Sequence, residues 1–190
     1  MFKWQKKGKI FQPTEECPSW MQCYAQLPKT IILNDRLRIY FSTRPSIEKN
    51  LQYRSRTGFI DVQLDDFKNI IQISKKPVMQ LGEVGTFDEF GIMCGSIIYD
   101  QNKYLLYYTG WQRQQSVPYK WSIGLATSDD GETFKRLYDG PILESKFDPY
   151  LQACPIVYKI NSREWHMYYL SGLKWYKENN KLESQYVIKH

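Results

Sequence analysis

Three carboxylates lie just before apolar runs of the chain, and two of them, both aspartates, occupy matching places. Asp88 and Glu89 lie in the segment FDEFG and Asp148 lies in FDP, and each aspartate precedes by six residues a cysteine that opens an apolar run. Carboxyl groups held close together by rigid strands can act as general acid and general base. Alternatively, Asp88 and Asp148 bond backbone N–H groups and fix the loop that enters each strand. The residues alone leave both roles open.

A second acidic cluster lies in LATSDDGETFKRLYDGPIL, residues 125–143. The spacing (S/T)-x-D-x-G-x-T-(F/W) is matched by Thr127, Asp129, Gly131, Thr133 and Phe134. A calcium loop needs more oxygen ligands than this segment offers. The spacing resembles the Asp-box of sialidase-type propellers, and this resemblance implies a hairpin turn in which the Asp129 carboxylate accepts backbone N–H bonds and Gly131 adopts dihedrals unfavourable to other residues.

Several aromatic and polar residues are candidates for ligand binding, because they follow predicted strands and are expected in loops. Aromatic rings there can stack on the faces of sugars, and a guanidinium can bind hydroxyls or a carboxylate. Packing between sheets and surface ion pairs are the alternatives. The candidates are Gln26, Arg44, Arg54, Trp111, Tyr119 and Trp175.

An internal repeat supplies the elements that would position these residues. The segment LPKTIILNDRLRIYFST (27–43) aligns without a gap with CGSIIYDQNKYLLYYTG (94–110), and CPIVYKINSREWHMYYLSG (154–172) follows with one extra turn residue. A second kind of hairpin, residues 57–79 and 122–143, lies between them. Each unit therefore contains four strands, with Tyr40, Tyr107 and Tyr168 expected at equivalent positions. Tandem four-stranded units predict an all-β propeller rather than a β-sandwich.

The order of motifs also indicates a family. The motifs are YAQLP, RIYFSTR, GFIDV, GEVGTFDEFGIM, YYTGW, VPY, IGLATSDDGETF, GPIL, DPYLQACPIV and MYYLSGLKW. Together they resemble the bacterial glycosidase-like proteins related to the arabinanase, invertase and levansucrase propellers, and the 125–143 cluster resembles the Asp-box of sialidase-type propellers. The resemblance implies a five-bladed propeller with an axial sugar pocket, acting as a glycoside hydrolase on an oligosaccharide or glycoconjugate.

Two departures from that family limit what the resemblance implies. Leu27 and Ala153 stand where hydrolytic relatives carry acids, which leaves Asp88, Glu89 and Asp148 as the candidate catalytic carboxylates. A sugar-binding or assembly propeller that has lost its acids is therefore the alternative to a hydrolase.

The second departure is length, because the repeats make only two and a half to three blades. The single predicted domain, 1–190, contains units at about 24–79, 87–143 and 147–190. It is predicted to be an N-terminal fragment whose unpaired blade edges favour a homo-oligomer.

Composition excludes several other classes of protein. The net charge of +6 is scattered without a basic stripe, so no nucleic-acid partner is expected. No apolar run is long enough for a membrane span, which predicts a cytoplasmic protein without a membrane partner. Neither the spacing of the four cysteines nor the two histidines predicts a metal site, and no cofactor is expected. Free thiols are predicted at Cys17, Cys23, Cys94 and Cys154.

Overall fold

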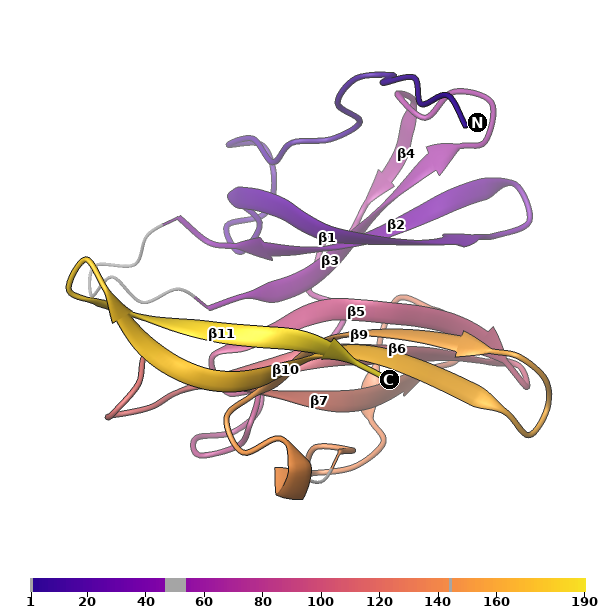
Figure 1. The fold of residues 1–190 in the computed structure, drawn as a ribbon. Coiled ribbons are helices and arrows are strands. Elements are labelled where there is room, and N and C mark those ends of the chain that lie inside the picture. Colours follow the sequence, from indigo (N-terminus) through magenta and orange to yellow (C-terminus); the bar gives the residue numbers. More distant parts are fainter. Residues whose placement is uncertain (1, 47–53, 144) are drawn as a thin grey trace.

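The computed structural model describes residues 2–46, 54–143 and 145–190 and is built from three antiparallel sheets (Figure 1). The first sheet has the order β1 (Cys23–Ile32), β2 (Arg36–Arg44), β3 (Arg56–Gln63) and β4 (Ile70–Ile73). The second has β5 (Gly91–Asp100), β6 (Lys103–Arg113), β7 (Tyr119–Ser128) and β8 (Lys135–Arg136). A short 3-10 helix, η1 (Ser145–Phe147), precedes the third, with β9 (Gln152–Lys159), β10 (Trp165–Glu178) and β11 (Lys181–Lys189).

This arrangement is a partial β-propeller, and it confirms the predicted all-β fold. Each sheet runs up and down in chain order, as a propeller blade does. The inner strands β1, β5 and β9 contact one another in succession. We refer to the sheets below as the first, second and third blades.

Two hairpin turns follow directly from local sequence. Gln101 and Asn102 join β5 to β6 with φ values of 47° and 61°, and Asn179 and Asn180 join β10 to β11 with φ values of 49° and 62°. Two successive residues with positive φ are the mark of a type I′ turn, whose twist matches that of the flanking strands. Polar residues such as Asn tolerate this conformation, which explains why these positions read as turns in the sequence.

A register irregularity interrupts the inner-strand pairing in every blade. It lies between Gln26 and Lys29 in β1, between Cys94 and Ser96 in β5, and opposite Cys154 in β9. Leu27 and Cys154 adopt left-handed φ values of 54° and 52° there. An extra residue of this kind bends a strand and redirects the side chains before it.

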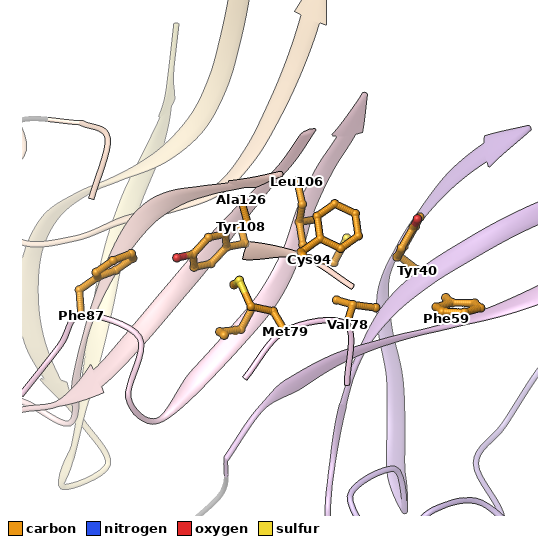
Figure 2. Packing of buried hydrophobic residues seen from close by; sticks show 11 residues of the cluster. Tyr40, Phe59, Val78, Met79, Phe87, Cys94, Leu106, Tyr108 and Ala126 are labelled. Atoms are coloured by element: carbon orange, nitrogen blue, oxygen red, sulfur yellow. The ribbon is translucent and has the colours of Figure 1, made fainter. Parts of the chain in front are cut away.

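An apolar core joins the first two blades (Figure 2). The second blade contributes Leu106 and Tyr108, which lie in the same cluster as Tyr40 and Phe59 of the first. The segment between the blades adds Val78, and all five of these side chains are at most 2% exposed. The remaining buried members are Met79, Phe87, Ile92, Cys94, Ala126 and Phe134. Burial raises the pKa of the Cys94 thiol to about 12.

Side-chain hydroxyls repeat the same contact from one blade to the next. Ser42 Oγ accepts the N–H of Cys94 at 3.0 Å, and Thr109 Oγ1 accepts the N–H of Cys154 at 2.8 Å. Each hydroxyl accepts an N–H group of an innermost strand at or beside the bulge, and so satisfies a backbone donor at the edge of its sheet. The bulges therefore become fixed contacts between blades.

The hairpin turn in residues 125–143 is present, but its acceptor is the neighbour of the predicted residue. Asp130, not Asp129, accepts the N–H groups of Glu132 at 2.7 Å and Thr133 at 2.9 Å, while Gly131 has φ +70°. Burial would raise the pKa of Asp130, but these bonds outweigh it and hold the pKa below its ordinary value. Asp129 lies 81% exposed and pairs with Lys103.

That turn is attached to the first blade by a buried guanidinium. Arg38 is 1% exposed and binds Asp61 at 2.7 and 2.8 Å, while a third contact of 2.9 Å reaches Glu132 in the turn. The Gly131 carbonyl accepts bonds from Arg38 at 3.1 Å and from the Tyr40 hydroxyl at 2.6 Å. We call this group, Arg38, Tyr40, Asp61, Gly131 and Glu132, the Arg38 network.

Removing the carboxylate of the Arg38 network should destabilise the protein strongly. Asp61→Ala leaves a buried guanidinium without its bidentate partner, and we expect a loss of about 3–5 kcal/mol in the free energy of unfolding. Urea denaturation measures it. Asp129→Ala, which removes an exposed pair, is the control and should cost no more than about 1 kcal/mol. Similar losses in both variants would contradict the role of the network.

One face of the third blade is apolar and exposed. The register places Ile156 beside Tyr168 across β9 and β10, and places Tyr186 and Ile188 on the same side of β11. All four side chains are at least 40% exposed. In addition, β11 is an edge strand in a blade with three strands where the others have four. Such a face and edge favour association with another polypeptide surface.

We expect the 190-residue chain to self-associate through this face. Ile188→Lys places a charge on the most exposed side chain of this face and should shift the sedimentation equilibrium toward monomer. Ile32→Lys is a matched control, because Ile32 is 71% exposed on the first blade and Ile188 is 72% exposed. A monodisperse monomer at every concentration, or an equal effect of both variants, would contradict the prediction.

Candidate functional site

An array of three aromatic rings joins the second and third blades. Tyr119 stacks on Trp121 with 4.5 Å between ring centroids, and it meets Trp175 edge-on at 5.0 Å. The Tyr119 hydroxyl lies 3.3 Å from Ser184 Oγ. Tyr119 and Trp175 were expected in loops; they lie instead near the start of β7 and within β10, where strand pairing holds them rigidly. We call Tyr119, Trp121 and Trp175 the aromatic array.

A second group surrounds Phe90, just before β5. Its ring lies 5.8 Å from that of Trp111, which stands in β6 rather than in a loop. The guanidinium carbons of Arg54 and Arg113 lie 5.9 and 5.2 Å from the Phe90 centroid. Ser55 makes two backbone hydrogen bonds beside Phe90. Its N–H donates to the Phe90 carbonyl, and its carbonyl accepts the N–H of Ile92. These bonds hold Arg54, which precedes the first strand-forming residues of β3, beside Phe90 of the second blade.

Strand register brings the two groups together. Trp111 stands opposite Trp121, and Arg113 stands opposite Tyr119, in the pairing of β6 with β7. Opposite residues in an antiparallel pair project to the same side of the sheet at about 5 Å. The predicted residues Arg54, Trp111, Tyr119 and Trp175 therefore belong to one surface that extends across three blades.

The other two predicted ligand residues lie nearer the first blade. Arg44 stacks over Tyr24, with 5.7 Å from its guanidinium carbon to the ring centroid, and donates to Ser55 Oγ at 3.2 Å. Gln26 is exposed in β1 opposite Ser42. Ser55 thus connects Arg44 to the Phe90 group, whereas no contact links the Gln26 side chain to the aromatic array within the described ranges.

Asp88 is fully buried and saturated with side-chain partners. Its carboxylate accepts bonds from the Tyr108 hydroxyl at 3.0 Å, from Arg136 Nε at 2.8 Å and from Thr86 Oγ1 at 3.2 Å. The Arg136 ion pair connects the entry of the innermost strand to the outermost strand, β8. These contacts hold the loop in place, although through side chains and not through the backbone N–H groups expected from sequence.

Asp148 repeats this arrangement in the third blade. Its carboxylate accepts bonds from Tyr169 at 3.1 Å, Gln152 at 3.2 Å, Lys189 at 2.7 Å, and from the Ser171 hydroxyl. Burial would raise its pKa, but the Lys189 ammonium and the hydroxyl and amide donors outweigh burial and hold the pKa of Asp148 below its ordinary value. Asp148 is therefore ionised at neutral pH and suits a base better than an acid.

A small cavity connects Asp148 with the aromatic array. It has a volume of about 50 Å³, and its lining includes Asp148, Gln152, Lys120 and Trp121. This space suffices for a water molecule between polar groups.

Glu89 differs from both aspartates because it is only partly buried. Its carboxylate accepts the N–H of Gly85 at 2.7 Å, and it directly precedes Phe90 in the chain. Of the three predicted carboxylates, Glu89 is the one with a solvent-accessible side chain next to the Phe90 group.

The first blade replaces the repeated aspartate and tyrosine with apolar residues. At the repeat offset of 67, Met21 corresponds to Asp88 and Phe41 to Tyr108. Met21 and Phe41 are 0% and 2% exposed and pack with Phe11 of the N-terminal segment. In the first blade, hydrophobic packing therefore stabilises the place where the other two blades have a hydrogen-bonded carboxylate.

Sequence reasoning missed Phe90, Arg113 and Trp121. Phe90 follows the predicted carboxylates in FDEFG, and Trp121 lies two residues after Tyr119, so adjacency to a motif was the available signal. No pattern indicated Arg113.

Within the described ranges, no group of three or more His, Cys, Asp or Glu residues is arranged to hold a metal ion. The same residues contain no helix long and apolar enough to cross a membrane.

Comparison with curated proteins finds relatives of unknown activity. Uncharacterized proteins from two strains of Mycobacterium tuberculosis are 36% identical over 174 residues, which is 90% of this chain and 56% of theirs. The chain thus spans a little over half the length of these relatives. No protein-family model matches the sequence.

Comparison with solved structures decides the fold. A protein described as a glycoside hydrolase aligns with a TM-score of 0.67 at 12% identity, over 96% of this chain and 57% of that one. The GH32 β-fructofuranosidase BmSUC1 of Bombyx mori aligns with a TM-score of 0.59 at 15% identity, over 86% and 33%. The chain has the fold of a glycoside hydrolase propeller. The predicted resemblance is therefore confirmed at the level of fold.

The depressed pKa of Asp148 predicts how stability depends on pH. Because the folded pKa is lowered, the ionised carboxylate stabilises the native state above the unfolded pKa of about 3.9, and this stabilisation is lost as pH falls through the folded value. Asp148→Asn should therefore lower the urea midpoint at pH 7 and lower it progressively less between about pH 5 and pH 2. Asp139→Asn, at an exposed position, is the control. A deficit that does not change with pH would contradict the assignment.

Proposed function

We propose that the chain forms the carbohydrate-binding face of a glycoside hydrolase-type propeller, with an oligosaccharide bound against the aromatic array. The observation that carries this is the rigid placement of Tyr119, Trp121 and Trp175, all partly exposed, on paired strands of two blades. Partly exposed aromatic rings offer an apolar face to sugar C–H groups, and the neighbouring Lys120 can bond hydroxyls.

Binding is the better supported part of this function because two of the three predicted acids are already engaged. The Asp88 carboxylate is buried against Arg136 and Tyr108, and the Asp148 carboxylate is held ionised. Glycoside hydrolysis needs one carboxyl group kept protonated as the general acid. Asp88 and Asp148 therefore fit a positioning role, and Glu89 is the carboxylate best situated to touch a ligand.

Hydrolysis is the second candidate function, favoured by the cavity that joins Asp148 to Trp121. An ionised carboxylate beside a water-sized cavity fits a general base, and Glu89 would then be the acid. The pairing of Asp88 or Glu89 with Asp148 remains the catalytic hypothesis. Under it, Asp148→Asn or Glu89→Gln should lower turnover of aryl glycosides by about 100-fold or more. Turnover unchanged in the Asp88, Glu89 and Asp148 variants alike would exclude it.

The binding proposal is tested by titrating the chain with a panel of oligosaccharides while following tryptophan fluorescence. Trp121→Ala and Trp175→Ala should each weaken binding by about tenfold, the scale of one lost stacking contact. Trp165→Ala is the matched control, because Trp165 stands at the opposite end of β10 from Trp175 and contacts Lys159. Absence of binding by any oligosaccharide, or equal losses in all three variants, would refute the proposal.

A further inference from the structure

We infer that the Phe90 group is an anion-binding subsite that selects glycans carrying an acidic substituent. The inference deepens the proposed function and rests on it. The substituent is defined by its chemistry, as negatively charged oxygens on a sugar ring, whether carboxylate, sulfate or phosphate. Arg54 and Arg113 are the residues that would bind it.

The first argument is the convergence of two like charges on one ring. The guanidinium carbons of Arg54 and Arg113 lie 5.9 and 5.2 Å from the centroid of Phe90. Stacking on an aromatic face leaves the N–H edges of a guanidinium free to donate in its plane. Two such forks at one ring raise the local positive potential and form a site for bidentate contacts to an anion.

The second argument is the contrast with the three arginines that bind buried aspartates. Arg36 and Arg38 bind Asp61, and Arg136 binds Asp88. Within the described ranges, no carboxylate lies within ion-pair distance of Arg54 or Arg113. Both side chains are exposed, so an incoming ligand can reach them. Arg36, Arg38 and Arg136 are thus paired with buried aspartates, whereas Arg54 and Arg113 are available to a ligand.

The third argument is position. Arg113 stands directly opposite Tyr119 of the aromatic array. Trp111 contacts the ring of Phe90 and is paired across the strands with Trp121, so it links the two groups. A sugar stacked on the array would place a substituent of the same or the next ring toward the guanidinium groups. Backbone bonds between Ser55 and Phe90 hold Arg54 in register with this surface. Recognition of the sugar ring and of its charge can therefore occur together.

The test compares one neutral β-linked glucose tetrasaccharide with versions that carry a terminal glucuronate, 6-sulfate or 6-phosphate. Calorimetric titration should show at least one acidic version binding about tenfold or more tightly than the neutral one, and the preference should fall as NaCl increases. Arg54→Gln and Arg113→Gln should each reduce the ratio of acidic to neutral affinity by about tenfold. Arg163→Gln, an exposed residue in the β9–β10 turn, is the matched control.

The outcomes separate this inference from the proposed function. Equal binding of neutral and acidic versions would overturn the anion subsite and leave the carbohydrate-binding function standing, whereas no binding of any version would refute both. Inorganic phosphate competing as strongly as the phosphorylated glycan would overturn selection of a charged sugar, as would equally tight binding of a single-stranded oligonucleotide. If the double variant Arg54→Gln/Arg113→Gln still bound the acidic glycans more tightly than the neutral one, other residues would be responsible for the selectivity. That result would overturn the roles of both arginines.

Discussion

The buried pairing of Arg38 with Asp61 determines how the first two blades meet. A guanidinium removed from water requires a carboxylate and further acceptors, and the second blade supplies them through Glu132 and the Gly131 carbonyl. Because a charged group tolerates little displacement of its partners, the turn after β7 docks in one position. The neighbouring apolar core packs the two blades together, while the ionic network fixes the geometry of their contact.

The inner strands receive a second constraint from hydrogen-bonded carboxylates. Asp88 and Asp148 bind a tyrosine of their own blade, Tyr108 or Tyr169, just before the strand begins. The same aspartates are candidate catalytic groups by their position in the sequence, because a carboxylate at the entry of an inner strand could either fix the strand or act as an acid. Their full set of partners favours the structural role. In the proposed function, recognition is assigned to residues just outside these anchors, with Glu89 and Phe90 directly following Asp88.

The proposed binding surface depends on the order of the blades along the chain. Arg54 comes from the first blade, Phe90 and Arg113 from the second, and Trp175 from the third. Antiparallel pairing keeps Arg113 and Tyr119 rigid at the strand ends, where side chains project beyond the packed core. A propeller thus builds a binding surface from short segments far apart in sequence, each held by its own sheet.

The sequence by itself determined the fold class, the order of strands and several turns. The recurrence of the hairpin motif at 67 residues and the turn chemistry of Gln101 and Asn102 are properties of the chain itself and do not depend on how the blades pack against one another. Sequence spacing could not choose between Asp129 and Asp130, because adjacent carboxylates have equal propensity, and only the folded backbone of the turn directs Asp130 onto the N–H groups of Glu132 and Thr133. Nor could it place Arg113 beside Arg54, because both meet at Phe90 only after two blades pack. Contacts within one hairpin follow from sequence spacing, whereas contacts between blades follow from the packing angle and the buried partners, and these exist only in the tertiary structure.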